Sequence, residues 1–241
     1  MLDLIKMFAG AGITTNEKQE EKAMKRFFGT DSPLFRFMTI LLELAEINLL
    51  FILCSIPIVT MGASYAAMTD SMNEMHVHGE GCFTARRFFQ VFKKSLKPMV
   101  PIGTVILVCC LGLGFNVRYV LKTMEGTGRI LFCGIYVVLF LILSGIFQYA
   151  AFLAAKTEKW NKDYLKNSFL LALAKFPLVI LTTLLSISVL SVLMMSVSLM
   201  LRMLPVILLF WFSCPAYVCV GLHRRALKPL LPELFSEEDE A

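Results

Sequence analysis

Four carboxylates and one asparagine amide stand out in a largely apolar sequence, because all five can bind cations and the carboxylates can also exchange protons. Glu43 and Glu46 are three positions apart, and Asp70 and Glu74 are four apart, so each pair shares a face if its segment is helical. Asn48 completes the group. Ionisable residues inside a membrane are costly to bury and commonly mark an ion or proton path. The sequence nominates these five residues as a candidate functional cluster, and a hydrated cluster near the cytoplasmic interface is the alternative reading.

The stretch Leu44–Ala67 organises the elements that must position this cluster. It begins as an apolar helix, breaks at Pro57 and restarts after Gly62 with small residues. A proline inside an apolar helix bends the chain, and a bilayer tolerates this only where other helices cover the freed backbone. We expect two antiparallel helices that approach through small side chains and bring the carboxylates to one depth. The cations expected to relieve the repulsion are Arg36, Arg86, Arg87 or a bound ion.

Composition favours a membrane protein over a soluble one. Hydrophobic residues make up 57% of the 241 residues and charged residues 17%, whereas soluble domains average about 45–50% and about 25%. The apolar residues also come in long blocks, which is typical of transmembrane helices. We therefore predict an all-α polytopic bundle of six spans, of which the second is short and polar. The expected spans are residues 35–59, 60–77, 99–119, 130–154, 177–199 and 205–221.

Positive charge sets the expected topology. With six spans and both termini cytoplasmic, the only external cations of the 23 lysines and arginines are Arg118, Lys122, Arg129 and Arg202. A five-span arrangement divides the cations far more evenly, so the positive-inside rule favours six spans. The expected organisation is a cytoplasmic arm (1–33), a transmembrane domain (34–222) and an acidic cytoplasmic tail (223–241).

Two cytoplasmic amphipathic helices are expected in the membrane interface, near residues 83–97 and 161–176. In the first, the aromatic residues Phe88, Phe89 and Phe92 are expected to face the apolar phase. Its basic face is expected to contact anionic lipid headgroups and consists of Arg86, Arg87, Lys93, Lys94 and Lys97. The lipid bilayer and those headgroups are therefore the expected partners, and nucleic acid is not.

Metal and enzyme chemistry receive little support from the sequence. The loop 76–82 could ligate a metal through His76, His78, Glu80 and Cys82, but no second ligand cluster accompanies it. The cysteines are expected to be reduced hydrophobic residues, since none forms a CxxC pair. No HExxH or GxSxG motif is present. We expect no metal, no cofactor, no catalytic residues and no enzymatic activity.

The residues around Pro57 carry a family resemblance. The sequence NLLFILCSIPIVTMGAS, which includes Asn48, Pro57, Thr60, Gly62 and Ser64, resembles the YesL family signature, roughly NLLW-x-x-CSLPIVTIGAS. Residues 88–97 resemble the F-x-x-F-K-x-N-F-K segment of that family, although Phe51 stands where Trp is common and Ser95 where Asn is common. The resemblance implies a bacterial integral protein of the cell membrane with an unassigned function.

Genes of that family often lie beside carbohydrate ABC-transporter components. The resemblance thus implies an accessory or regulatory component of carbohydrate ABC-type uptake, with permease subunits as candidate partners. The alternative is a transporter of ions or small solutes that uses the acidic cluster.

Overall fold

The computed structural model describes residues 33–79, 81–83, 85–156, 163–190 and 197–229, and every regular element in these residues is helical. The all-α prediction is therefore confirmed for them. The elements are α2 (Pro33–Cys54), η1 (Ile58–Thr60), α3 (Met61–His78), α4 (Ala85–Thr123), α5 (Thr127–Lys156), α6 (Asp163–Ala174), α7 (Phe176–Leu190), α8 (Val197–Phe210) and α9 (Ser213–Leu227). The chain divides into two compact units, residues 1–43 and 44–241. The predicted arm and most of the predicted tail lie outside the described residues.

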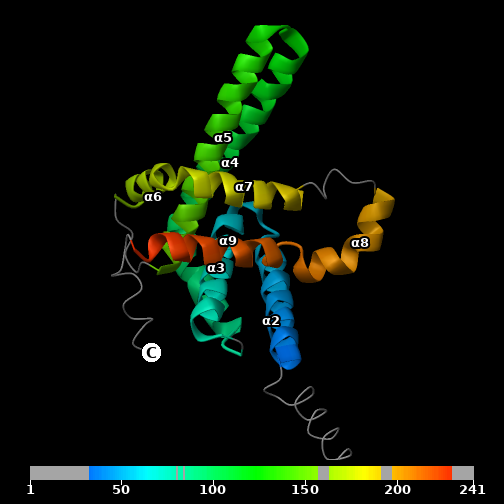
Figure 1. Cartoon of the computed structure of the whole chain (residues 1–241), viewed down its shortest axis with the longest axis vertical. Coiled ribbons are helices and arrows are strands. Elements are labelled where there is room, and N and C mark those ends of the chain that lie inside the picture. The colour runs from blue at the N-terminus through cyan, green and yellow to red at the C-terminus, as the bar shows by residue number, and fades with distance from the viewer. Residues whose placement is uncertain (1–32, 80, 84, 157–162, 191–196, 230–241) are drawn as a thin grey trace, which may run out of the picture. The chain divides into compact units, whose positions relative to one another are not determined.

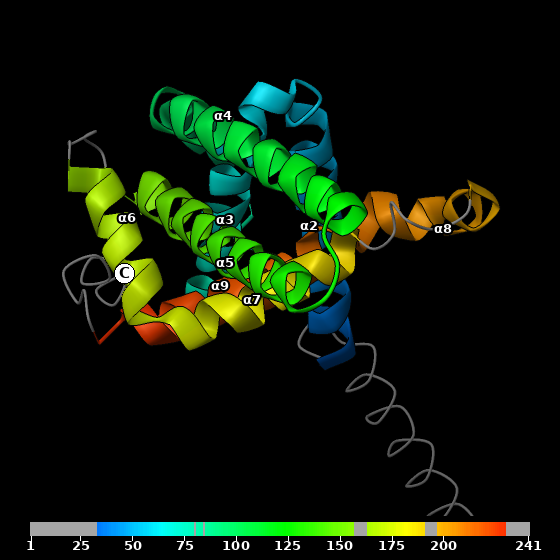
Figure 2. The same ribbon diagram turned by 90° about the horizontal axis from the view of Figure 1, so that it is seen from above.

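The centre of the second unit is α3. Helices α4, α5 and α9 all pack against it, and α3 is visible between α4 and α5 in Figure 2. Most of its polar side chains are buried, and the hydroxyls of Ser64, Thr69 and Ser71 donate to backbone carbonyl oxygens four residues earlier. Because each of these hydroxyls has a local backbone partner, a helix of low hydropathy can occupy the core.

Small residues allow α3 to approach its neighbours closely, as predicted. A Cβ atom on Gly62 would lie 3.2 Å from the carbonyl oxygen of Met99 in α4. Ala63 and Ala66 join one buried cluster with an alanine-rich segment of α5, which contributes Ala150, Ala151 and Ala154. The partner differs from the expected one, since these residues pack on α4 and α5 and not on the preceding helix. Sequence pattern predicts a close-packing face, but the partner depends on the chain path.

Helix α4 differs from the prediction, which divided this segment into an interfacial helix near residues 83–97 and a membrane span at residues 99–119. It runs unbroken for 39 residues and contains Pro98 and Pro101. A proline removes one backbone hydrogen bond without obliging the helix to end. Phe88 is fully buried and Phe92 packs on the core around α3, whereas Phe89 is exposed. The basic segment is thus the first part of a long helix, and it packs on protein through Phe88 and, in part, Phe92.

Among the described residues, three helices are long and apolar enough to cross a membrane: Phe35–Cys54 within α2, then α4 and α5. The pair α6 and α7, bent by 93°, gives a fourth if it counts as one span. The membrane-protein prediction is supported at this level, and the count of six spans is not confirmed. Helix α3 is too polar, and a break at Trp211 and Phe212 divides the predicted span 205–221 between α8 and α9. The predicted span 177–199 includes residues outside the described part.

Helix α6 occupies most of the predicted second amphipathic segment and packs on α5. The Tyr164 hydroxyl donates to the carbonyl of Ala150. Gly145 of α5 allows α7 to approach, because a Cβ atom there would lie 2.9 Å from a methyl carbon of Val179. Ala172 and Val179 share one buried cluster with residues of α5 and α9. Helix α6 therefore belongs to the packed protein and not only to a lipid interface.

Candidate functional site

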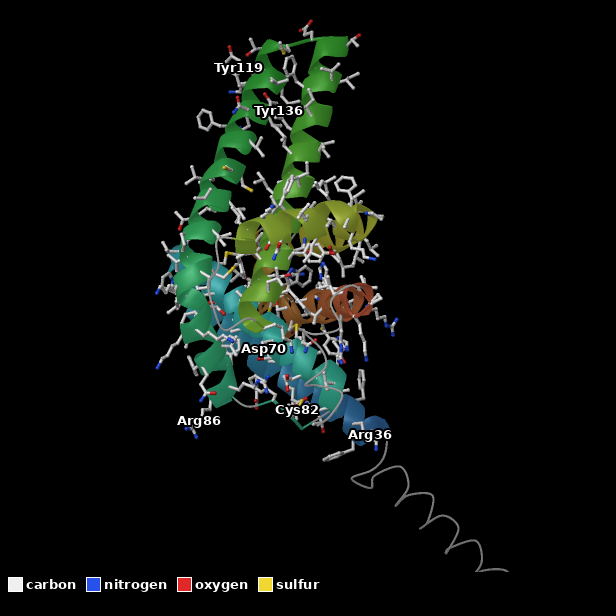
Figure 3. The ribbon with its side chains drawn as sticks, turned by 90° about the vertical axis from the view of Figure 1, so that its left-hand side faces the viewer. Arg36, Asp70, Cys82, Arg86, Tyr119 and Tyr136 are labelled. Atoms are coloured by element: carbon white, nitrogen blue, oxygen red, sulfur yellow. The ribbon has the colours of Figure 1, made fainter. Side chains whose placement is uncertain are left out.

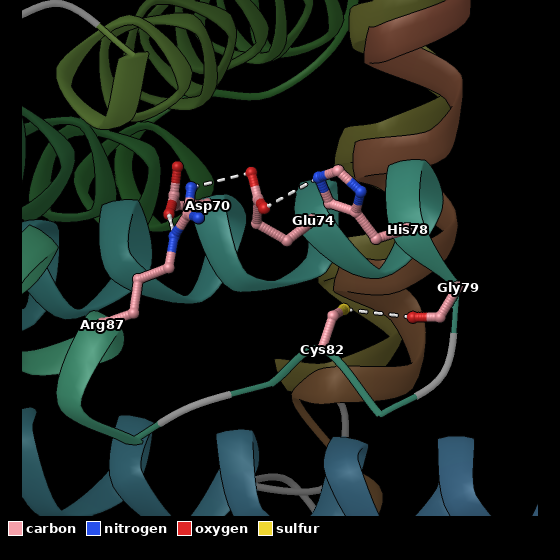
Figure 4. A network of polar contacts seen from close by, with 6 residues as sticks. All are labelled: Asp70, Glu74, His78, Gly79, Cys82 and Arg87. Atoms are coloured by element: carbon pink, nitrogen blue, oxygen red, sulfur yellow. Dashed lines mark hydrogen bonds and ion pairs between the residues drawn. The ribbon is translucent and has the colours of Figure 1, made fainter. Parts of the chain in front are cut away.

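The two carboxylates of α3 form an ion-paired cluster with one arginine. Asp70 and Glu74 are only 3% and 8% exposed. Arg87 lies between them, with its Nε 3.1 Å from Oδ2 of Asp70 and its Nη2 2.7 Å from Oε1 of Glu74 (Figure 4). Of the cations nominated from the sequence, Arg87 is the one that pairs with these carboxylates, and Arg86 is exposed and points away from Asp70 (Figure 3).

The turn between α3 and α4 places Arg87 there. Gly79 and Gly81 have φ angles of +82° and +83°, a backbone conformation that glycine adopts without steric cost. The turn reverses the chain, so the first turn of α4 returns alongside the last turns of α3. Cys82 donates its thiol to the carbonyl oxygen of Gly79 at 3.0 Å and closes the turn. A local turn therefore brings together charges that are 13 to 17 positions apart in sequence.

Two further side chains extend the cluster. His78 Nε2 lies 3.5 Å from Oε2 of Glu74, and the His78 side chain is 38% exposed. Lys156, the last residue of α5, interacts electrostatically with both Asp70 and Glu74. Arg87 is thus the cation that pairs directly with both carboxylates, and Lys156 adds electrostatic attraction from the end of α5. The ion pairs tie α3 to the start of α4.

The structure brings together two of the four nominated residues that lie in the second unit. Asp70 and Glu74 meet, whereas Glu46 is exposed on α2 and forms no ion pair with a described residue. Glu43 is buried and belongs to the first unit. Asn48 is buried in a different joint, described below. Similar depth along two helices is not sufficient for contact, because the side chains must also face one another.

The Asn48 side chain binds the backbone at the break between α8 and α9. Its Oδ1 accepts hydrogen bonds from the backbone N–H groups of Phe212 and Ser213, at 3.1 and 3.0 Å. The rings of Phe51 and Phe212 lie 5.5 Å apart beside it. Donors at the start of a helix have no partner within the helix, and an asparagine side chain is well suited to accept from them. Asn48 therefore has a capping role at a distance of 165 positions in sequence.

The other residues of the Pro57 motif also have local structural roles. Pro57 precedes η1 and has an extended backbone conformation. Thr60 donates its hydroxyl to the carbonyl oxygens of Cys54 and Pro57, at 2.7 Å each. Ser64 donates to the carbonyl of Thr60 at 3.2 Å, and Gly62 allows the close approach of α4. The motif builds the bend between α2 and α3.

Two polar groups in the core were not identified from the sequence. Gln148 Nε2 donates to Ser144 Oγ and Thr183 Oγ1, at 3.0 and 3.2 Å, and joins α5 to α7. His223 is buried beneath Tyr149 with ring centroids 4.9 Å apart, and burial lowers the pKa of His223 from 6.5 to about 4. The available signal for Gln148 was a strongly polar residue within an apolar block, whereas His223 is followed directly by Arg224 and Arg225 and has no such signal.

The metal ligands considered for the loop 76–82 do not assemble in the described residues. No three side chains of His, Cys, Asp or Glu come together there as a metal site. His76 turns toward α9 and donates from Nε2 to the carbonyl oxygen of Tyr217 at 3.0 Å. His78 faces Glu74, and Cys82 is bonded within the turn. Glu80 lies outside the described residues.

In a comparison with known proteins, a family model matches the part of the chain that contains these elements. No curated protein and no solved structure matches the chain significantly. The family model described as “Protein of unknown function, DUF624” matches residues 44–117. This segment contains the Asn48 cap, the Pro57 bend, all of α3 and the Arg87 ion pairs. Residues 44–117 are therefore similar to a family of unknown function, and the match covers Asp70, Glu74 and Arg87.

Proposed function

We propose that the chain is an accessory or regulatory membrane protein of a solute-uptake system. The observation that carries this proposal is the exposed apolar surface of α4 and α5. Only 6% of the most apolar window of either helix is buried within the chain. Phe115 and Ile130 are 82% and 75% exposed. The segment of α4 from Gly103 to Thr123 is roughly 31 Å long at about 1.5 Å per residue, which matches a hydrocarbon core of about 30 Å.

A hairpin of this length can cross a bilayer with its sides facing lipid or another membrane protein. Gly112 and Gly114 lie on this part of α4, and a Cβ atom at either would meet no atom within 4 Å. Small residues on a lipid-facing helix allow a second helix to approach closely. The surface thus fits a partner that is itself a transmembrane helix, and the YesL resemblance makes a carbohydrate ABC permease the first partner to test.

The ion pairs of Asp70 and Glu74 with Arg87 support the accessory role over the transporter alternative. A coupling site must bind and release a cation during each cycle. Here a cation would have to displace Arg87 from two carboxylates at hydrogen-bonding distance. The Glu74–His78 pair is the observation that favours the alternative, because it connects the cluster with the exposed side of His78.

Affinity purification from native membranes tests the proposal. The tagged full-length chain should recover permease subunits, identified by mass spectrometry. Gly112→Leu should reduce this recovery without unfolding the chain, because the site is open within the chain itself. Val105→Leu, at another exposed position of α4, is the matched control and should not. Equal recovery by both variants would contradict the role assigned to this face.

Reconstitution of the purified chain alone into liposomes tests the alternative. We expect no cation or sugar flux above that of empty liposomes. Flux that disappears in Asp70→Asn and Glu74→Gln variants would favour the transporter function instead.

A further inference from the structure

A pocket with a volume of about 220 Å³ lies beside the two breaks in the helical chain, one between α2 and α3 and the other between α8 and α9. Helices α2, α3, α5, α7 and α9 all contribute to its walls. Figure 1 shows α9 crossing α3 in this part of the chain. Of the residues that line the pocket, Met61 is 43% exposed, whereas Gln148 and Ala216 are buried. The pocket therefore extends from the surface of the chain into its core.

Aromatic rings form two walls of this pocket. The rings of Phe51 and Phe212 lie 5.5 Å apart, and those of Tyr65 and Phe147 are stacked with centroids 5.4 Å apart and planes inclined by 27°. Aromatic side chains pack favourably against a further ring, either stacked or edge to face. The size also suits one ring, since an apolar cavity of about 150 Å³ in another protein holds benzene. The walls thus fit a single aromatic ring with small substituents.

A buried acceptor lies at the inner end of the pocket. Nε2 of Gln148 donates to the hydroxyl oxygens of Ser144 and Thr183, at 3.0 and 3.2 Å. The amide oxygen Oε1 of Gln148 is buried and has no hydrogen-bond partner among the described residues. The Ser186 hydroxyl, which also lines the pocket, already donates to the carbonyl oxygen of Thr182. A buried acceptor without a partner is unfavourable, and a ligand that donates one hydrogen bond removes this cost.

We propose that this pocket binds a small neutral aromatic molecule that carries one hydroxyl or N–H donor. The ring packs against the aromatic walls, and the donor forms a hydrogen bond with Oε1 of Gln148. A neutral ligand fits because none of the described residues that line the pocket is charged. Neither the accessory role nor the Asp70 cluster uses this pocket, and the inference does not depend on either.

Two fluorinated probes of nearly equal shape test the hydrogen bond. Binding of 4-fluorophenol and 4-fluorotoluene to the full-length chain in neutral detergent micelles is measured by fluorine NMR. Each dissociation constant is compared between protein variants, because a given probe partitions into the micelles equally in every sample. Gln148→Met keeps a side chain of similar length and removes the acceptor. It should weaken binding of 4-fluorophenol about tenfold, or about 1.4 kcal/mol, and change that of 4-fluorotoluene less than about twofold.

The matched control is Gln90→Met, which makes the same substitution at an exposed position of α4 and should leave both affinities unchanged. Ala216→Leu places a larger side chain in the wall and should weaken binding of both probes at least about tenfold. If this variant does not fold, the comparison of Gln148→Met with wild type decides alone. Equal affinity of wild type and Gln148→Met for 4-fluorophenol, or equal losses for the two probes, would overturn the proposal. Binding by folded Ala216→Leu as tight as that of wild type would also overturn it.

Discussion

Removal of Arg87 is the most direct test of the charge cluster. Arg87→Gln leaves Asp70 and Glu74 buried without their closest cation. Breaking a fully buried ion pair costs about 3–5 kcal/mol, because one charge is left desolvated. The Arg87 side chain is 47% exposed, and Lys156 remains nearby. We therefore expect a smaller loss of about 2–3 kcal/mol in the free energy of unfolding.

Equilibrium unfolding in mixed micelles, followed by far-UV circular dichroism, measures this loss. Arg86→Gln removes the same charge from the neighbouring exposed position and should change the free energy of unfolding by less than about 0.5 kcal/mol. The triple variant Asp70→Asn/Glu74→Gln/Arg87→Gln removes all three charges and should recover at least half of the loss. The reasoning is refuted if Arg87→Gln is as stable as Arg86→Gln, or if the triple variant is no more stable than Arg87→Gln.

Three further predictions use the same unfolding measurement. Asn48→Ala should lose about 1–3 kcal/mol, because two backbone donors at the start of α9 lose their acceptor, and Asn48→Asp should retain most of that stability; equal stability of the alanine variant would contradict the capping role. Gly145→Ala should lose about 1–3 kcal/mol through overpacking against Val179, and adding Val179→Ala should restore part of it; a failure to restore any would argue against this contact. His223 has a folded pKa of about 4 against an ordinary value of 6.5, so stability is full above the higher value and is lost as the pH falls toward the lower one. Lowering the pH from about 7 to about 5 should cost about 2 kcal/mol in wild type and clearly less in His223→Gln, and equal pH dependence of the two proteins would exclude His223 as the cause.

The candidate site could be predicted only in part. The spacing of Asp70 and Glu74, and the need for a nearby cation, followed from residue types and helical periodicity. The choice of Arg87 depended on two glycines with positive φ angles, which turn the chain so that one arginine faces α3 while its neighbour Arg86 faces outward. Glu46 was expected to join this cluster but is exposed. Depth along a helix can be counted from sequence, whereas mutual orientation requires the packed structure.

The sequence by itself determined the helical class, the apolar segments of α2, α4 and α5, and the small-residue face of α3, because these depend on hydropathy and local periodicity. The tertiary structure decided which helices use that face, how far α4 continues through Pro98, and where the polypeptide breaks between α8 and α9. It also brought Asn48 to Ser213 and His76 to Gly221, pairs more than 140 positions apart. Contacts at such separations depend on the path of the whole chain, and no local pattern encodes that path.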